Sequence, residues 1–404
     1  MKKKIVLITT GQPSTNPRIV KEADALHAIG YDVTLLYCFF INWATESDRV
    51  ILEKVSWKYK MVGGCPHNQK SAFLFTRLRY KLALLFSRYI GTSFCVFERS
   101  QARAYDELLQ ETVNIKADWY IGHNLGALAV AVRAAKFHGA KAGFDFEDYH
   151  RGEIVRGEKY TLQRIRYLEN KYLPFLNYYS TASKLITEAV KKDHPFFKGT
   201  VITLNNCFPL KQQPLFIHKN PKDETLQLFW FSQTIGINRG LETLIEAVEF
   251  LNDPSIHVTL AGRCNKDMLA YIKLHSGAMF SNIHLAGIIQ PEKLPEFASQ
   301  FDVGLALETA FSVNNNIALS NKIFTYLLAG NAIILSNTTM QLAFNKVHAV
   351  GEIFAINDMS NLVEKIKYYK EKQVLNAQKR YNYLLATKQL NWDAESKNLL
   401  DVMK

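Results

Sequence analysis

Short apolar runs alternate along the first half of the chain with stretches whose apolar residues repeat at helical spacing. The runs predict strands at residues 4–9, 32–37, 118–122, 140–146, 178–183 and 201–205. Asn16 and Pro17 are typical of a helix N-cap and a first helical residue, and Gly30 predicts the end of that helix. Short apolar strands that alternate with helices indicate a parallel sheet covered on both faces.

The same alternation starts again after residue 208. It predicts strands at residues 226–231, 257–261, 284–286, 303–307, 332–335 and 352–356. Residues 209–224 between the two halves are polar and contain prolines, which is typical of a linker. A chain of 404 residues is also long for one core. The pattern therefore predicts an α/β protein of two domains, at residues 1–207 and 208–375, each with a parallel sheet covered by helices.

The segment 319–336 is the most informative part of the pattern. Ser320 predicts an N-cap whose hydroxyl accepts from a first-turn N–H, and Gly330 predicts the helix end. The apolar stripe between them consists of Ile323, Phe324, Leu327 and Leu328. A helix that starts at the carboxyl edge of a parallel sheet can bind an anion, although an ordinary helix–strand unit has the same pattern.

Residues 66–105 differ from the rest of the chain. They contain seven basic residues and one acidic residue, Glu98, and their apolar positions share one helical face (Leu74, Leu78, Leu82, Leu85 and Tyr89). A basic amphipathic helix can lie on an anionic membrane surface. A helix that packs this face on the core, with solvated basic flanks, is the alternative, and both remain open.

Charge and cysteine content narrow the classes of partner and compartment. The formal net charge of +12 favours anionic partners such as nucleotides, phospholipid head groups, nucleic acid or anionic sugars. Five scattered cysteines favour a reducing compartment over a disulfide or zinc framework. The first apolar run is too short for a signal peptide, and no run is long enough to span a bilayer. We therefore expect a cytoplasmic protein that is soluble or held at a membrane surface.

Several common catalytic motifs are missing from the sequence. It has no GxxxxGK[ST] loop, no GxGxxG after the first strand, no GxSxG elbow and no His pair at metal-binding spacing. Asp145-Phe146-Glu147-Asp148 is an acidic run that could hold a divalent cation on a diphosphate. The same run is typical of acids in a loop and at a helix start.

Seven segments together resemble the retaining glycosyltransferases of the GT-B fold, specifically family 4. They are residues 16–23, 28–33, 201–206, 230–240, 260–263, 283–287 and 321–330, in the order and spacing of that family. The resemblance implies transfer of a sugar from a nucleotide-diphosphate sugar to a saccharide or lipid-linked acceptor, with retention. It implies two Rossmann-like domains that face a cleft. The nucleotide-sugar would bind to the C-terminal domain and the acceptor to the N-terminal domain, to which a last helix (376–404) crosses back.

The resemblance also implies a biological setting and a set of partners. We expect a role in surface polysaccharide or glycolipid biosynthesis, in the cytoplasm and peripherally at the inner face of the plasma membrane, where residues 66–105 would meet the anionic surface. No cofactor or metal is expected, and nucleic acid is not an expected partner. A metal-free site must stabilise the departing diphosphate with cations and backbone N–H groups.

The site residues follow from the matching positions. Expected at the donor and its phosphates are Gly11, Gln12, Gln233, Arg239, Gly240, Ser320, Asn321, Lys322 and Thr325. Expected at the nucleobase or sugar are Gly262, Arg263, Ile288, Asn315 and Asn316. Three residues are expected at the reaction centre. Glu147 would orient or deprotonate the acceptor hydroxyl, and His123 would position the acceptor or a phosphate. Glu308 would substitute for a glutamate that the family usually has and this sequence lacks.

The sequence departs from the family pattern at three positions. Gln233 stands where the family usually has an arginine, and Thr325 and Ile317 stand where it usually has glutamates. These departures leave two alternatives open beside a transferase. One is a nucleotide-sugar epimerase of the same fold, and the other is a non-catalytic subunit that binds sugar nucleotides.

Overall fold

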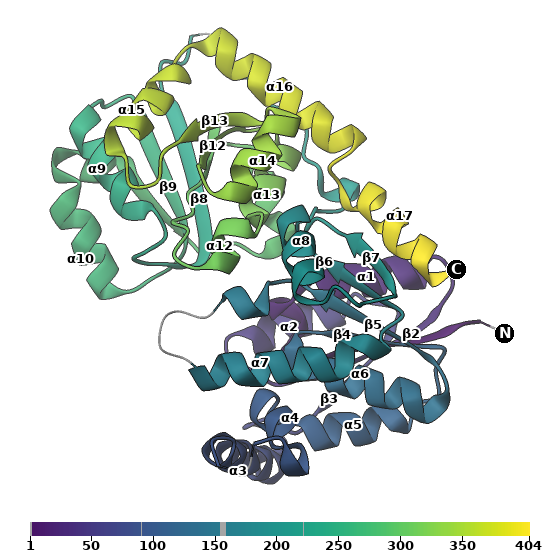
Figure 1. Cartoon of the computed structure of the whole chain (residues 1–404). Helices are drawn as coiled ribbons and strands as arrows, with labels where there is room; N and C mark the ends of the chain where they lie inside the picture. The colour runs from purple at the N-terminus through teal and green to yellow at the C-terminus, as the bar shows by residue number, and fades with distance from the viewer. Residues whose placement is uncertain (1, 90, 154–158, 221) are drawn as a thin grey trace. The chain divides into compact units, whose positions relative to one another are not determined.

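The chain divides into two compact units. The structure, a computed structural model, describes residues 2–89, 91–153, 159–220 and 222–404. Unit 1 comprises Met1–Leu204 and Ser396–Lys404, and unit 2 comprises Asn205–Glu395 (Figure 1). Each unit is built on its own parallel sheet.

Unit 1 contains a seven-stranded sheet in the order β3-β2-β1-β4-β5-β6-β7. Its strands are β1 (Lys4–Thr9), β2 (Asp32–Cys38), β3 (Lys58–Val62), β4 (Trp119–His123), β5 (Lys141–Phe146), β6 (Tyr178–Thr181) and β7 (Thr200–Thr203). The six predicted strands are confirmed, whereas β3 was not predicted. It is an edge strand whose first three residues are exposed, so it has no apolar run to reveal it.

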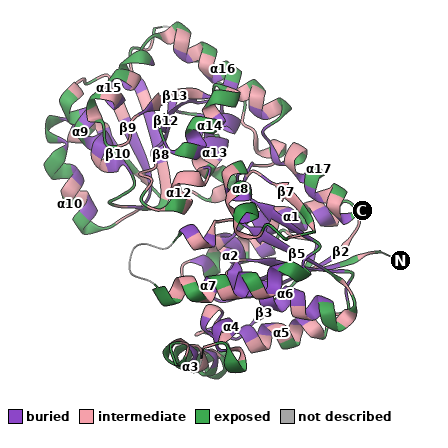
Figure 2. Ribbon diagram, in the orientation of Figure 1, coloured by how far each residue is buried: buried purple, intermediate pink, exposed green. Residues whose placement is uncertain are grey.

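Helices cover both faces of this sheet. They are α1 (Pro17–Ala28), α2 (Ala44–Leu52), α3 (Lys70–Phe86), α4 (Val96–Gln101), α5 (Tyr105–Val113), α6 (Leu125–His138), α7 (Lys159–Tyr172) and α8 (Lys184–Asp193). Asn16 caps α1 as predicted, since its side chain accepts from the N–H of Ile19 at 3.3 Å. Helix α6 is buried on nearly all sides, whereas α3 is mostly exposed (Figure 2).

Unit 2 contains a six-stranded sheet in the order β10-β9-β8-β11-β12-β13. Its strands are β8 (Leu226–Ile235), β9 (Ile256–Cys264), β10 (Ile283–Gly287), β11 (Val303–Ala306), β12 (Ala332–Ser336) and β13 (Gly351–Phe354), so all six predicted strands are confirmed. Its helices are α9 (Leu241–Leu251), α10 (Lys266–His275), α11 (Leu294–Ala298), α12 (Val313–Ile317), α13 (Asn321–Ala329), α14 (Thr339–His348), α15 (Met359–Tyr368) and α16 (Lys372–Lys388).

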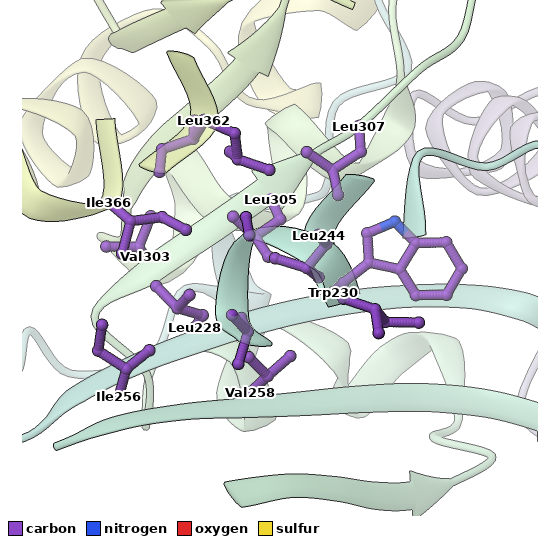
Figure 3. Close-up of a cluster of buried hydrophobic side chains, with 14 of the residues drawn as sticks. Leu228, Trp230, Leu244, Ile256, Val258, Val303, Leu305, Leu307, Leu362 and Ile366 are labelled. Carbon is purple, nitrogen blue, oxygen red and sulfur yellow. The ribbon is translucent and has the colours of Figure 1, made fainter. Parts of the chain in front are cut away.

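One apolar cluster fills the side of this sheet that α9 and α15 cover. Trp230 of β8, Val258 of β9 and Leu305 of β11 pack there with Leu244 of α9 and Leu362 of α15 (Figure 3). Helices α13 and α16 pack against each other and against β12. The start of α13 is thereby fixed at the carboxyl edge of the sheet.

The last helix, α17 (Trp392–Met403), joins the two units. Its first residues belong to unit 2, and residues from Ser396 onward belong to unit 1, where Leu399 and Met403 lie in the core. The Nζ of Lys3 donates to the carbonyl oxygen of Met403 at 3.0 Å. The predicted domain bounds were 207 and 376, whereas the division falls after Leu204 and Glu395 because α16 packs within unit 2.

The strand order of both sheets reverses direction next to their first strand. In unit 1 this point lies between β1 and β4, and in unit 2 between β8 and β11. Ligands of open parallel sheets bind outside the carboxyl ends of the strands at such a point. Within the described residues, no helix is long and apolar enough to cross a membrane.

Candidate functional site

A carboxylate at the reversal point of unit 2 links the segment after β11 to helix α12 and to the start of α13. Glu308 follows β11, and its Oε1 accepts hydrogen bonds from Ser320 Oγ and Lys322 Nζ, both at 2.9 Å. Its Oε2 accepts from Asn315 Nδ2 at 3.1 Å. Burial alone would raise the pKa of Glu308, but the charge of Lys322 and these hydrogen bonds outweigh it and lower the pKa. Glu308 is therefore ionised at neutral pH and holds Lys322 beside the start of α13.

The start of α13 differs from its prediction in one hydrogen bond. Ser320 occupies the N-cap position as predicted, but its hydroxyl donates to Glu308 and makes no cap hydrogen bond to the helix. The first-turn N–H groups of α13 are therefore left without a side-chain cap. Such groups, with the positive end of the helix dipole, form a site for an anion. Lys322 adds a cation there, 5.5 Å from the ring of Trp230.

The loop after β8 brings a second cation to the same edge. Arg239 is exposed, and its Nη1 donates to Ser232 Oγ at 2.9 Å. The next residue, Gly240, has φ 75° and starts α9. A Cβ at Gly240 would lie 2.7 Å from the Cβ of Leu307, so only glycine allows this loop to approach the end of β11.

The residues expected near the nucleobase lie along the same edge. Gly262 and Arg263 are near the end of β9, and Arg263 is in register with Thr234 of β8. At Gly262, φ is 142° and a Cβ would lie 2.3 Å from the carbonyl oxygen of Ser232. Ile288 directly follows β10 and is 62% exposed. Gln233 is exposed at a bulge in the last part of β8.

Three residues expected at the phosphates, nucleobase or sugar make hydrogen bonds within the fold instead. Thr325 is fully buried, and its hydroxyl donates to the carbonyl of Asn321 at 3.4 Å, so it does not face a ligand at the sheet edge. Asn316 Oδ1 accepts from the N–H of Thr339 at 2.9 Å, at the start of α14. Asn321 Oδ1 accepts from Asn206 Nδ2 at 2.9 Å. Periodicity did not reveal the contacts of Asn316 and Asn321, because each joins segments that are far apart in the sequence.

Asn315 lies beside Glu308, in the short helix α12. Ser312 caps this helix, α12, by accepting from the N–H of Asn315 at 3.0 Å. Among the described residues, the buried Oδ1 of Asn315 has no hydrogen-bond partner. A ligand hydroxyl is one group that could donate to it.

In unit 1, Gln12 has a structural role. Its side chain is 2% exposed, and its Oε1 accepts from the N–H groups of Phe40 at 3.0 Å and Ile41 at 2.7 Å. Its Nε2 donates to Asp48 Oδ2 at 2.5 Å. The side chain of Gln12 therefore ties the loop after β1 to the loop after β2, while Gly11 stands beside it in the same loop.

His123 belongs to a buried network of charges at the strand ends of unit 1. Its ring is 1% exposed, and its Nε2 lies 2.9 Å from Glu22 Oε2. Its Nδ1 lies 3.6 Å from Asp145, which accepts from Arg18 Nη2 at 2.6 Å. Burial opposes a charged imidazole, but the two carboxylates outweigh burial and raise the pKa of His123. Arg18 and Glu22, which lie on the buried face of α1, were not expected as site residues.

Asp145, the first residue of the acidic run, is held in this network by neighbouring side chains. Arg18 binds it through two nitrogens, and Ser180 Oγ donates to it at 2.6 Å. Within the part of the chain that the structure describes, no group of three or more His, Cys, Asp and Glu side chains is placed to hold a metal ion.

Glu147, close to this network, has a pKa near neutral pH. It directly follows β5 and is partly buried. Burial and the neighbouring charge of Asp148 raise its pKa to about 7, against the opposing effect of Arg18. A carboxyl with this pKa can accept or donate a proton at neutral pH.

Replacing Glu147 with glutamine is expected to make the protein more stable at pH 8 but not at pH 4. The folded-state pKa of Glu147 lies above the unfolded value of 4.5, so its ionisation destabilises the fold as pH rises from about 4.5 to 7. A shift of that size corresponds to on the order of 3 kcal/mol. Urea unfolding at both pH values would measure the effect. Glu188→Gln, at an exposed site on α8, is the control, and an equal gain at both pH values would contradict the assignment.

A pocket of about 710 Å³ lies in unit 1 beside α3. The carboxyl end of β2 and the loop after it form one wall, with Phe39 and Phe40. Arg77, Lys81 and Leu84 of α3 form another. The pocket is mostly apolar with a basic border, which suits an amphiphilic anion.

Comparison with solved structures identifies the fold. The crystal structure of HepE from Anabaena in complex with UDP and glucose is similar at a TM-score of 0.70 and 12% identity, over 99% of each chain. A glycosyltransferase from Rickettsia africae matches at 0.67 and 11%, over 100% of each chain. Sucrose-phosphate synthase from Thermosynechococcus elongatus matches at 0.69 and 13%, over 100% of this chain and 98% of that one. No protein-family model matches the chain, and no curated protein does.

These similarities extend over the whole length of the chain and establish its architecture. The predicted fold class is confirmed: an α/β protein with two Rossmann-like units, each a parallel sheet with helices on both faces, as in the GT-B fold. At such low identity the similarity concerns the fold alone.

Proposed function

We propose that the protein is a glycosyltransferase that moves a sugar from a nucleotide-diphosphate sugar to an acceptor, with retention. The observation that carries the proposal is the arrangement at the reversal point of unit 2. There the uncapped start of α13, Lys322 and Arg239 lie at one sheet edge. These groups are the donors that a diphosphate leaving group requires. HepE, whose fold is similar, has been crystallised with UDP-glucose.

Each cationic residue has a separate role in this proposal. Lys322 has three donors, and Glu308 accepts only one of them, so Lys322 can also donate to a phosphate oxygen. Glu308 is then a positioning residue that fixes the ammonium group. Arg239 would bind the outer face of the diphosphate. Because these groups supply the positive charge, the proposed reaction requires no metal and no cofactor.

The acceptor side of the proposal rests on unit 1. Glu147 would orient the acceptor hydroxyl, while the leaving phosphate oxygen takes its proton, as in a same-face mechanism with retention. The pocket beside α3 would hold part of a saccharide or lipid-linked acceptor. A role in surface polysaccharide or glycolipid assembly at the inner face of the plasma membrane would follow.

Incubation with a panel of nucleotide-sugars, starting with UDP-glucose, tests this function. We expect slow release of nucleoside diphosphate without acceptor, and no loss of that activity in the presence of EDTA. Interconversion of two nucleotide-sugars would instead indicate an epimerase. Binding without turnover would indicate the non-catalytic subunit, the alternative that Gln233 and Thr325 raise. Failure of every nucleotide-sugar to bind would refute the proposal.

A further inference from the structure

The exposed side of α3 carries a continuous apolar stripe. Six large side chains on this helix are between 43% and 61% exposed: Leu74, Phe75, Leu78, Leu82, Leu85 and Phe86. At about 100° per residue they fall within roughly 120° of the helix circumference. Thr76 and Ala83, on the opposite side, are the buried residues of the helix. The alternative of a helix that packs its leucines on the core is therefore wrong.

Cations run along one border of this stripe. Lys70, Arg77 and Lys81 project within about 40° of one another, next to the apolar sector. All three are exposed, and none forms an ion pair with a described residue. Arg79, at the other border, is paired with Asp106 at 3.0 Å and with Glu107. The stripe thus has one border of paired charge and one border of unpaired positive charge.

Charge decides which partner suits this surface. A second copy of the chain, meeting stripe to stripe, would bring the same unpaired cations close together. An anionic bilayer offers hydrocarbon to the apolar stripe and phosphate to the cations at the same depth. Unpaired lysine and arginine beside exposed leucine and phenylalanine are the composition of helices that lie in the membrane interface.

The pocket beside α3 shares this cationic border. Arg77 and Lys81 line the pocket as well as flanking the stripe, and Phe73 and Leu84 extend its apolar wall. A lipid whose chains remain in the bilayer would place its phosphate at this border. The groups attached to that phosphate would then lie in the pocket.

We propose that α3 docks unit 1 on an anionic lipid bilayer, and that Arg77 and Lys81 bind the phosphate of a lipid at the pocket. Docking itself uses only α3 and does not require the proposed function. The further statement that the acceptor is an anionic lipid rests on the proposed function.

Vesicle co-sedimentation of the full chain tests this inference. We expect binding to vesicles of phosphatidylglycerol and phosphatidylcholine in equal amounts, little binding to phosphatidylcholine alone, and weaker binding in high salt. Arg77→Gln with Lys81→Gln should lower the affinity roughly 25-fold, at about fivefold for each cation. Leu78→Glu with Leu82→Glu should lower it by about tenfold or more.

Matched variants control for surface charge and surface apolarity elsewhere. Lys191→Gln with Lys192→Gln, at exposed sites on α8, and Leu274→Glu, 77% exposed on α10, should bind vesicles like the wild type. Equal binding by the α3 variants, or equal binding to neutral vesicles, would overturn the proposal. So would a dimer in solution that the leucine variants abolish.

A parallel titration with UDP-glucose in solution separates this inference from the proposed function. The α3 variants should keep the wild-type affinity for the nucleotide-sugar. Loss of vesicle binding with intact donor binding supports docking. A wild type that binds vesicles but no nucleotide-sugar would leave docking supported and refute the transferase proposal.

Discussion

Replacing Lys322 with methionine is expected to lower kcat/KM for the nucleotide-sugar roughly 100-fold. Methionine keeps the length of the side chain but removes the ammonium group that would meet the departing diphosphate. Steady-state release of nucleoside diphosphate measures the loss. Lys346→Met, at an exposed position in the last turn of α14, is the matched control and should retain wild-type activity.

The same substitution leaves the Glu308 carboxylate without its cation. Activity could therefore fall only because an unpaired charge disturbs the site. Glu308→Gln removes that charge, so the double variant Lys322→Met with Glu308→Gln separates the two causes. If Lys322 acts on the phosphate, the double variant stays impaired; if it only neutralises Glu308, activity returns.

Replacing Arg18 with methionine is expected to destabilise the protein by about 3–5 kcal/mol, which is typical of a buried ion pair that loses one partner. The Arg18 and Asp145 side chains are 3% and 1% exposed, and Arg18 Nη1 also donates to the carbonyl oxygen of Leu204 at 2.8 Å. Urea unfolding measures the effect. Arg49→Met, which breaks only exposed pairs on α2, should change stability little.

The Arg18 variant should also change the pH dependence of stability. Burial opposes ionisation of Asp145, but Arg18 outweighs it and lowers its pKa to about 2, below the unfolded value of 3.8. In the wild type this carboxylate therefore stabilises the fold above about pH 4, and the contribution is lost as pH falls towards 2. Without Arg18 we expect the loss to begin at higher pH. An unchanged acid-unfolding midpoint would contradict this account.

The parts of the fold that the sequence predicts are those with a strong local pattern. Buried strands such as β1 and β12 are short apolar runs, and Asn16 and Gly330 mark helix ends through local hydrogen bonding and backbone conformation. Strand β3 was not predicted because it is an edge strand whose first three residues are exposed, so it contains no apolar run. Its pairing with β2 depends on a partner that no local pattern contains.

The details of the site depend on contacts between distant segments. The sequence places Ser320 correctly at the helix start. It cannot show that the Ser320 hydroxyl donates to Glu308, twelve residues earlier, instead of capping the helix. In the same way, no local pattern shows that Gln12 accepts hydrogen bonds from the loop after β2. Helical periodicity reveals the apolar face of α3 but not whether the core covers it, since burial depends on the tertiary fold.

Binding of UDP to the wild type and to the double variant Lys322→Met with Glu308→Gln tests the central claim most directly. Calorimetric titration measures both affinities without turnover or acceptor. The claim that Lys322 holds the diphosphate at the start of α13 requires clear binding by the wild type and a loss of about tenfold or more in the double variant. Equal affinities, or no binding by the wild type, would contradict it.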